Sequence, residues 1–350
     1  MDNEYTQRIK KIEAELEHWL PSDRNSDWKN NIFSGIEKEK NAVCSSASFD
    51  ALFTPLKDML SRGGKRWRPL LMTLVCETLG GADAALPLAP LVEFSHNASL
   101  IHDDIEDNSG QRRGRPAIHT IYGTDTAINS GSFLYFLSLC CIESYKGENK
   151  EQIYRIWSEY MRRLHLGQAI DISWHRDINF IPDMDEYYYM CTLKTGSLAR
   201  LATELGVYAA GGSQEAAQVS GEVTEKLGIG FQILDDIRNL TTGILGKKRG
   251  DDIVEGKKSL PVILYLKKHP KQKEKISRCF YEAKIKGIAV PEVNEVIKLI
   301  TEAGILKEAE EKALSLINDA RVFFKSEQYA GIPAKKEGRD LLNGFIDLIS

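Results

Sequence analysis

The strongest constraint on the fold is a helical spacing of apolar residues that runs through most of this 350-residue chain. In the segment that a proline at position 90 opens, apolar side chains step by three and four residues, which places them on one face of a helix: Leu91, Phe94, Ala98, Ile101 and Ile105. Strand-like alternation is scarce, and Gly/Pro-rich breaks separate segments of helical length. The pattern predicts an all-α, single-domain bundle of about a dozen helices over 1–350.

Composition narrows the class of protein. Hydrophobic residues make up 42% of the chain, charged residues 27%, and the net charge is -4, which argues against nucleic acid as a partner. The six cysteines form no CxxC pair, which favours reduced thiols. The charged N-terminus is unlike a signal peptide, and the most apolar run, 133–142, is shorter than the ~20 residues that span a bilayer. We expect a soluble, cytoplasmic protein without membrane insertion.

Acidic residues crowd the end of the helix that begins near position 90. Asp103, Asp104 and Asp107 lie, with His96, roughly opposite the apolar stripe. Like charges repel one another, and acids at a helix C-terminus oppose the macrodipole. A positive ligand would offset this cost, because carboxylates four residues apart can share Mg²⁺ with phosphate oxygens. The alternative is an ordinary solvated acidic face.

A second acidic cluster, in FQILDDIRNL, repeats this arrangement on another apolar helix. Gln232, Asp235, Asp236 and Asn239 recur along one helical seam that begins at Gly228. One such cluster is weak evidence, but two of them facing each other in a bundle would make a multi-metal site. Such a site commonly holds a diphosphate.

Basic residues occur in separate patches. GGKRWRP puts Lys65 and Arg68 between a Gly-Gly turn and a helix start, which favours an anion, although a solvated turn explains it equally well. The arginines at 112–113 could simply neutralise the neighbouring acids. Gly196 weakens a helix after Lys194, which indicates a kink or a close approach to a ligand. The charged loop 246–261 is either an exposed loop or a lid over a metal–phosphate complex.

Five motifs, taken in order, resemble those of the trans-isoprenyl diphosphate synthases, most closely the geranylgeranyl type. They are GGKRWRP, DDIEDNSGQRRGRP, KTGSLA, FQILDDIRNL and GKKRGDDIVEGKKSLP. They span 63–261. The resemblance implies a helical bundle of the isoprenoid synthase type with a central active-site cavity, on which the helices of 1–45 and 262–350 pack, and a homodimer. One departure is Asn239, where the common second motif ends in Asp.

The resemblance also implies the activity and the site. The chain would condense isopentenyl diphosphate head to tail with an allylic diphosphate. Three Mg²⁺ ions would be held by Asp103 and Asp107 on one side and Asp235 on the other, with Asp104 and Asp236 in support. Residues that would bind the allylic diphosphate or steady the carbocation are Arg112, Lys194, Thr195, Gln232, Lys247 and Lys257. Those that would bind isopentenyl diphosphate are Gly64, Lys65, Arg68, His96 and Arg113.

Product length in this family depends on the residues four and five places before the first acid. Here they are Ser99 and Ala98, which are small and argue against the shortest product. We expect geranylgeranyl diphosphate, with farnesyl or longer diphosphates as alternatives. Phe133, Tyr135 and Phe136 could close an apolar tunnel lower down, although core packing is the simpler explanation for each of them.

Three other functions would share part of this pattern. A class I terpene cyclase has paired acids in a helical bundle but needs no second diphosphate site, so GGKRWRP and the arginine pair favour the synthase. A non-catalytic subunit of a heteromeric synthase would tend to lose acids, and both clusters here are nearly complete. A helical scaffold with acidic surfaces would bind neither Mg²⁺ nor diphosphates.

Overall fold

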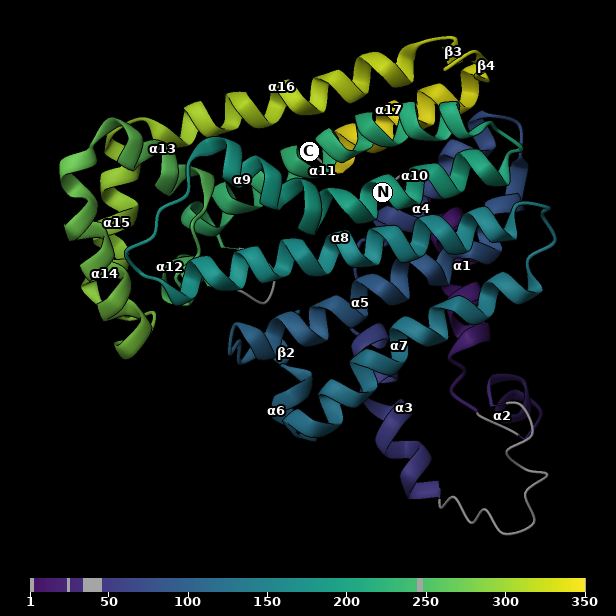
Figure 1. The fold of residues 1–350 in the computed structure, drawn as a ribbon, viewed down its shortest axis with the longest axis horizontal. Helices are drawn as coiled ribbons and strands as arrows, with labels where there is room; N and C mark the ends of the chain where they lie inside the picture. The colour runs from purple at the N-terminus through teal and green to yellow at the C-terminus, as the bar shows by residue number, and fades with distance from the viewer. Residues whose placement is uncertain (1–2, 24–25, 34–45, 244–247, 350) are drawn as a thin grey trace.

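The computed structural model describes residues 3–23, 26–33, 46–243 and 248–349. Within these ranges the chain is almost entirely helical, as the spacing of apolar residues predicts (Figure 1). Its strands are two hairpins of two-residue strands, in which β1 pairs with β2 and β3 with β4. Lys247 lies outside the described residues.

The elements follow the predicted pattern of helices separated by short breaks. Those of the first half are α1 (Asn3–Trp19), α2 (Ser26–Ile32), α3 (Ser46–Ser61), α4 (Trp67–Thr78), η2 (Ala82–Leu88), α5 (Ala89–Glu106), β1 (Gln111–Arg112), β2 (Arg115–Pro116), α6 (Ile118–Tyr122), α7 (Thr124–Ser144) and α8 (Lys150–Arg176). Those of the second half are α9 (Met184–Cys191), η3 (Thr192–Gly196), α10 (Ser197–Ala209), α11 (Gln214–Thr241), α12 (Asp251–Glu255), α13 (Leu260–Lys268), η4 (Pro270–Gln272), α14 (Lys273–Lys286), α15 (Pro291–Glu302), α16 (Ile305–Lys325), β3 (Gln328–Tyr329), β4 (Ile332–Pro333) and α17 (Lys336–Ile349).

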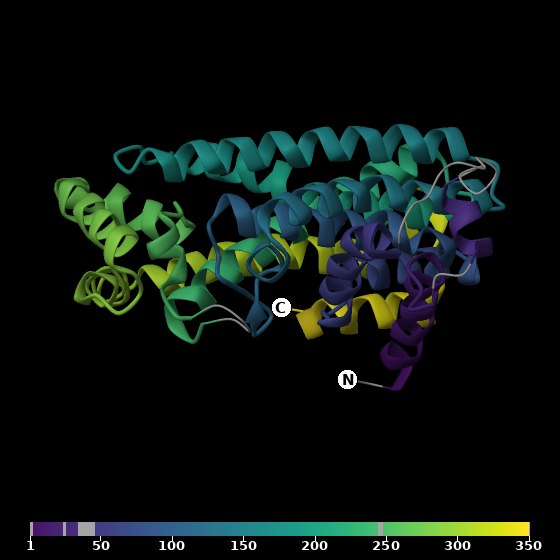
Figure 2. The same ribbon diagram turned by 90° about the horizontal axis from the view of Figure 1, so that it is seen from below.

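The helix α10 lies at the centre of the bundle, packed between α4 and α11. Gly206 permits this close approach, because a Cβ atom there would lie 2.5 Å from the backbone oxygen of Met72. Long helices α5, α7 and α8 complete the bundle, and α8 crosses its whole length in both ribbon views (Figures 1 and 2). The result is a single connected cluster of buried apolar side chains.

The two ends of the chain pack on this bundle. The hydroxyl group of Tyr5 in α1 donates a hydrogen bond to the backbone oxygen of Leu341 in α17, at 2.8 Å. In addition, α17 packs on α4, and α16 packs along α11. The segment after residue 262, which carries no recognisable motif, therefore covers the helix that bears the second acidic cluster.

The helix α5 forms as its sequence predicts. Pro90 lies in its first turn, where a missing N–H group costs nothing. Leu91, Phe94, Ala98 and Ile101 are fully buried, and the helix ends at Glu106. The acids thus lie at the C-terminal end of a helix whose other face is fixed in the core.

The aromatic residues of α7 lie in different surroundings. Phe133 stacks on Phe33 at 5.7 Å between ring centroids and meets Phe53 edge-on at 5.4 Å, so it belongs to the core. Phe136 is 66% exposed, so the suggestion that it closes an internal tunnel is wrong. The helical spacing alone could not show which face of α7 turns outward.

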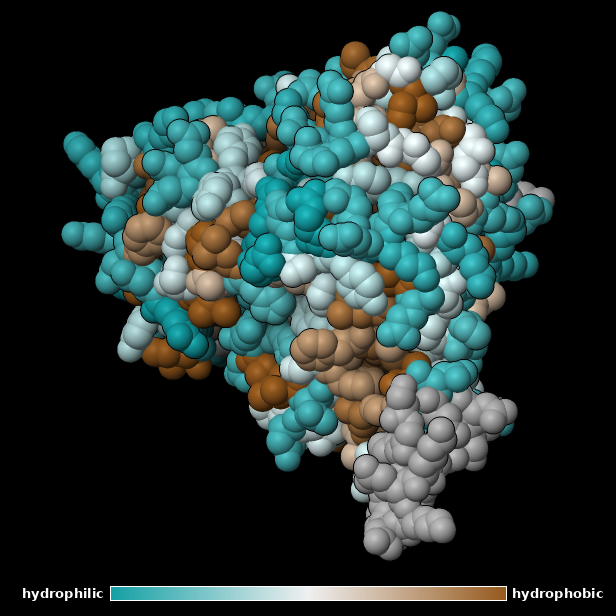
Figure 3. Space-filling view, turned by 45° about the vertical axis from the view of Figure 1, so that its right-hand side comes forward, coloured by the Kyte–Doolittle hydropathy of each residue, from teal (hydrophilic) through white to brown (hydrophobic). Residues whose placement is uncertain are grey.

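The face of the molecule seen in Figure 3 is mainly polar, with smaller groups of apolar side chains. None of the described helices combines the length and the apolar character needed to cross a membrane.

Candidate active site

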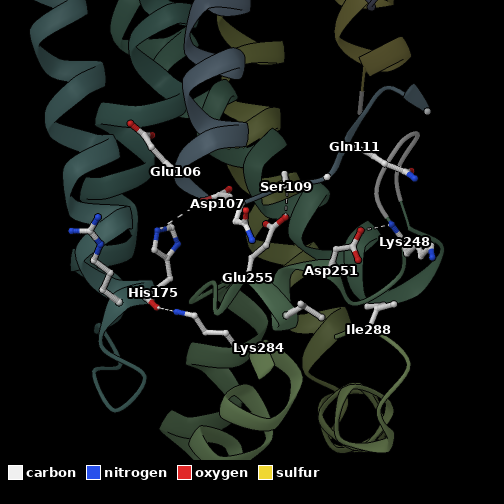
Figure 4. A pocket seen from close by; sticks show the side chains of 15 residues that line it. Glu106, Asp107, Ser109, Gln111, His175, Lys248, Asp251, Glu255, Lys284 and Ile288 are labelled. Atoms are coloured by element: carbon white, nitrogen blue, oxygen red, sulfur yellow. Dashed lines mark hydrogen bonds and ion pairs between the residues drawn. The ribbon is translucent and has the colours of Figure 1, made fainter. Parts of the chain in front are cut away.

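The C-terminal end of α5 lies where α8, η3, α11 and α12 converge. Beside it is an open pocket of about 740 Å³, to which α5, α8, α12 and α14 contribute side chains (Figure 4). Among the residues that line it are Glu106, Asp107, Ser109, His175, Asp251 and Glu255. Asp107 of the first acidic cluster therefore borders this pocket, whereas Asp103 and Asp104 are not among its lining residues.

Cations from distant parts of the chain bind the first two acids. The Lys194 ammonium lies 3.1 Å from Asp103 Oδ1, and Arg112 donates to Asp104 at 2.8 Å and to Asp103 at 3.2 Å. The amide of Gln168 in α8 also donates to Asp103 Oδ1, at 3.0 Å. Lys194 also pairs with Asp171 at 2.5 Å. Burial lowers the pKa of Lys194, but Asp103 and Asp171 outweigh that effect and raise it, so the ammonium stays charged.

The third acid of this cluster, Asp107, has a fully buried side chain. It forms an ion pair with Lys257 at 2.8 Å, and Lys257 in turn lies 2.9 Å from Glu255. Burial raises the pKa of Asp107, although Lys257 opposes this shift. Three cations, Arg112, Lys194 and Lys257, are thus shared by five carboxylates. These carboxylates belong to Asp103, Asp104, Asp107, Asp171 and Glu255. This cluster carries excess negative charge that a further cation would offset.

The expected irregularity around Lys194 is a π-helical turn, η3, which places the start of α10 close to both neighbouring helices. Gly167 of α8 makes this possible, because a Cβ atom there would lie 2.4 Å from the backbone nitrogen of Lys194. On the other side, a Cβ atom on Gly228 of α11 would lie 3.1 Å from the Cα atom of Gly196. Two glycines on neighbouring helices thus let this turn present Lys194 and Thr195 to the site.

The second acidic cluster divides into a buried and an accessible half. Asp236 is buried and accepts hydrogen bonds from the Tyr187 hydroxyl group at 2.7 Å, the Gln232 amide at 3.0 Å and the backbone N–H group of Leu260 at 3.0 Å. Burial, reinforced by the charge of Asp252, raises its pKa to about 7. Gln232 Oε1 accepts a hydrogen bond from the Thr195 hydroxyl group at 2.9 Å, which links this network to η3.

The accessible half is Asp235, whose side chain is 50% exposed and lies 3.2 Å from Arg238. Asn239, where the family's common motif has Asp, is fully buried. Its side-chain oxygen accepts from the backbone N–H group of Asp252 at 3.3 Å, and its backbone oxygen accepts from that of Gly250 at 2.8 Å. Asn239 therefore anchors the start of α12, and this contact needs an oxygen acceptor but no charge.

The turn in GGKRWRP is held by a buried arginine. Arg66 has a left-handed backbone conformation, with φ of 46°, and lies 2.7 Å from both Glu13 of α1 and Glu93 of α5. Gly64, at φ of 141°, adopts a conformation that favours glycine, and a Cβ atom there would lie 3.0 Å from the Arg113 guanidinium. Arg113 donates to the backbone oxygen of Gly63. The turn and the second arginine are therefore packed together.

Three basic side chains meet at this turn. Arg68 lies 3.2 Å from the imidazole of His96 and stacks over the ring of Trp67. Burial lowers the pKa of Arg68 and that of Arg113 to about 10, and neighbouring arginines also contribute to the shift of Arg113. Burial, with the charges of Arg68 and Arg113, holds the pKa of His96 well below its ordinary value. Lys65 is exposed beside them. In the described part of the chain, neither Arg68 nor Arg113 forms an ion pair with a carboxylate.

Four polar residues of this region were not identified from the sequence. They are Gln168 and Asp171 on α8, Tyr187 on α9, and Glu255 on α12. A signal was present for the first two, because both interrupt the stripe of α8 that carries Met161 and Leu164. Tyr187 resembles any buried aromatic residue until its hydroxyl partner is known.

Comparison with known proteins agrees with this geometry. The family model described as polyprenyl synthetase matches residues 50–299. This chain belongs to the polyprenyl synthetase family. A geranylfarnesyl diphosphate synthase of Aeropyrum pernix is 34% identical over 307 residues, 83% of this chain and 91% of that protein. A geranylgeranyl diphosphate synthase of Methanosarcina mazei is 32% identical over 278 residues, 78% of this chain and 82% of that protein.

The fold agrees as well. A crystal structure of a geranylgeranyl pyrophosphate synthase superimposes with a TM-score of 0.81 at 22% identity, over 100% of this chain and 98% of that one. This polyprenyl synthetase is accordingly a trans-prenyltransferase, an isoprenyl diphosphate synthase with the all-α fold of its family.

The donor set of this polyprenyl synthetase suits a hard divalent cation such as Mg²⁺. Asp103, Asp107 and Asp235 offer carboxylate oxygens. Asp107 Oδ1 is buried without a hydrogen bond from the described residues, while Oδ2 pairs with Lys257. The described residues hold no ready-made group of three or more His, Cys, Asp or Glu side chains that could enclose a metal. Mg²⁺ commonly takes one or two carboxylates and fills its other positions with phosphate oxygens and water.

We predict that Gly167→Ala will impair turnover. The added methyl group would meet the Lys194 backbone at 2.4 Å, so η3 would have to shift away from α8 and carry Lys194 and Thr195 with it. A fall in kcat of tenfold or more, with the far-ultraviolet circular dichroism of the wild type, is expected in assays of the purified protein. Ser173→Ala, a small change at an exposed position of the same helix, is the control; equal rates for the two variants would contradict the prediction.

Proposed function

We propose that this polyprenyl synthetase condenses isopentenyl diphosphate head to tail with an allylic diphosphate, using Mg²⁺, and that its main product is all-trans geranylgeranyl diphosphate. The observation that supports this proposal best is the presence of two anion-binding regions of different electrostatic character. One pairs its cations with an excess of acids, and the other has buried cations without acids. A condensation of two diphosphates needs two such sites.

The region without acids suits isopentenyl diphosphate. Arg68 is buried and Arg113 is partly buried, and burial lowers the pKa of both, so an anion placed between them would be strongly favoured. Glu93, the nearest buried acid, already accepts from Arg66 and from Asn97. In this proposal Lys65, His96 and the Gly64 turn complete the site, which needs no metal.

The region with acids suits the allylic diphosphate. Asp103 and Asp107, with Asp235 from α11, would hold Mg²⁺, three ions in all, which would neutralise the charge that develops on the leaving diphosphate. Arg112, Lys194 and Lys257 would then turn from their acids to the diphosphate oxygens, and Lys247 is expected to join them. Asp104 and Asp236 support this arrangement through their contacts with Arg112 and Gln232.

Cleavage of the allylic C–O bond leaves a carbocation, which the double bond of isopentenyl diphosphate attacks. Until this attack occurs, the carbocation must be stabilised by dipoles that do not react with it. The Thr195–Gln232 hydrogen bond and the backbone oxygens of η3 would supply them in a site that excludes water. A proton is then lost from the new allylic unit, and the released diphosphate would accept it.

Within the chain itself, the expected product length rests on two small residues that precede the acids, Ala98 and Ser99. The relatives of this chain include both geranylgeranyl and geranylfarnesyl diphosphate synthases, which is compatible with a product of this size. The cluster of Arg68, His96 and Arg113 disfavours a terpene cyclase, which would have no second diphosphate to bind.

The deciding experiment is incubation of the purified chain with labelled isopentenyl diphosphate, Mg²⁺ and each allylic starter in turn, followed by chromatography of the dephosphorylated lipids. Incorporation only when both Mg²⁺ and an allylic starter are present supports the synthase. Conversion of an allylic diphosphate without isopentenyl diphosphate would support a cyclase. A chain that is inert alone but changes a partner's product would be a subunit of a heteromeric synthase.

We also propose a homodimer formed through α7 and α8. Phe136 and Ile128 of α7 are 66% and 47% exposed, and Leu166 of α8 is 50% exposed, so these two neighbouring helices present large apolar side chains that a partner could cover. A dimer in sedimentation velocity, shifted towards monomer by Phe136→Asp, is expected. A wild-type monomer at micromolar concentration would contradict it.

We predict that Asp103→Ala will lower kcat/KM by about 100- to 1,000-fold, because it removes a metal ligand of the transition state. The fold should persist, since the substitution also removes local charge repulsion. Asp319→Ala is the matched control, because Asp319 is an exposed acid on α16 that lies 3.6 Å from Lys226. A near-normal rate for Asp103→Ala would rule out the metal assignment.

Arg68→Ala should raise the KM for isopentenyl diphosphate more than that for the allylic substrate. Loss of a charge-assisted contact is worth roughly 1.5–3 kcal/mol, about 10- to 100-fold. Steady-state kinetics with each substrate varied in turn measures the two KM values. Arg155→Ala, on the exposed face of α8, serves as control. Equal changes in both KM values would argue against separate anion sites.

A further inference from the structure

Two stripes of residues face each other across α5 and α8 below the first acidic cluster. On α5, Asp103, Ser99 and Ser95 recur every four residues. Hydrogen bonds to α8 mark the two ends of this stripe. Gln168 donates to Asp103 at 3.0 Å at one end, and the indole N–H group of Trp157 donates to the Ser95 hydroxyl oxygen at 3.1 Å at the other.

The surroundings between these two bonds are apolar or small. On α8 the intervening residues of the stripe are Leu164, four residues before Gln168, and Met161, four residues after Trp157 and three before Leu164. On α5 the stripe offers Ser99, whose hydroxyl group donates back to the His96 backbone oxygen at 2.8 Å. A hydrocarbon chain lying here would therefore meet methyl groups, a thioether and a hydroxyl group whose hydrogen bond is already formed.

A third helix closes one side of this space. The ring of Tyr135 in α7 lies 5.9 Å from that of His102 in α5 and 5.3 Å from that of His165 in α8. These three rings form a layer next to the acids, and Ser95 and Trp157 form another about two helical turns further down. The facing surfaces of α5 and α8 thus run from a polar end at Asp103 to an aromatic end at Trp157.

We propose that Trp157 is the floor of the channel that receives the growing prenyl tail, and that it sets the length of the product. The indole spans from α8 to α5, and its bond to Ser95, which is fully buried, fixes its orientation. Eight residues of α5 separate Ser95 from Asp103, about 12 Å at the helical rise of ~1.5 Å per residue. This inference rests on the proposed function, because only a prenyl-transferring site needs a channel of defined depth.

The test compares Trp157→Ala with Trp157→Phe, with labelled isopentenyl diphosphate and chromatographic sizing of the lipids. Trp157→Ala removes the floor and should shift the main product by one or more isoprene units towards longer chains. Trp157→Phe keeps most of the ring while losing the hydrogen bond, so its main product should stay within one unit of the wild type. Ser95→Ala, which removes only the acceptor, should resemble Trp157→Phe.

A second variant guards against misfolding of Trp157→Ala. Ser99→Phe places a ring above the floor and should shorten the main product, whereas a role of Trp157 in packing alone predicts no such ordered series. If the wild type incorporates isopentenyl diphosphate but neither Trp157→Ala nor Ser99→Phe changes product length, the inference is wrong and the proposed function stands. If the wild type incorporates none, the proposed function fails, and this inference fails with it.

Discussion

The crowding of carboxylates at the end of α5 is the constraint on which the rest of the site depends. Acids at a helix C-terminus are unfavourable, and four of them, Asp103, Asp104, Glu106 and Asp107, lie within five positions at this one. The chain compensates with cations from distant elements: Arg112 from β1, Lys194 from η3 and Lys257 from the segment after α12. Each of these ion pairs fixes a different part of the bundle against α5. The electrostatic cost of the acids is thus also what brings the parts of the site together.

The cations near the acids differ in kind from those at the Gly64 turn. Lys194 and Lys257 sit among carboxylates, which raise the pKa of both against the effect of burial. Arg68 is buried and Arg113 is partly buried, and here the effect of burial prevails and lowers the pKa of each to about 10. The first pair already has counter-charges and can exchange them for a metal–diphosphate complex. The second pair lacks them, so it can bind an anion directly. This difference would let one chain distinguish two similar diphosphates.

Much of the fold could be predicted from the sequence, because α5 and α11 have clear apolar stripes and definite starts. The acids and the basic turn stood out for the same reason, since charges on apolar helices are conspicuous. What could not be predicted depends on three-dimensional neighbours. Gln168 and Tyr187 matter through the carboxylates they contact, which lie 65 and 49 residues away in the chain. Phe136 seemed as suited to the interior as Phe133, and only the packing of α7 separates them.

The helix α8 connects these conclusions. It contributes Gln168 to Asp103, approaches η3 through Gly167, and carries Trp157 across to Ser95. A continuous helix of 27 residues is stiff, so the distance between its contact with the acids and its contact with Ser95 is fixed by the backbone rather than by loops. If the tail of the product lies between them, its length is measured along one rigid element. A substitution at Trp157 would then change where the channel ends without disturbing the chemistry at Asp103, because the two contacts share a helix but no side chain.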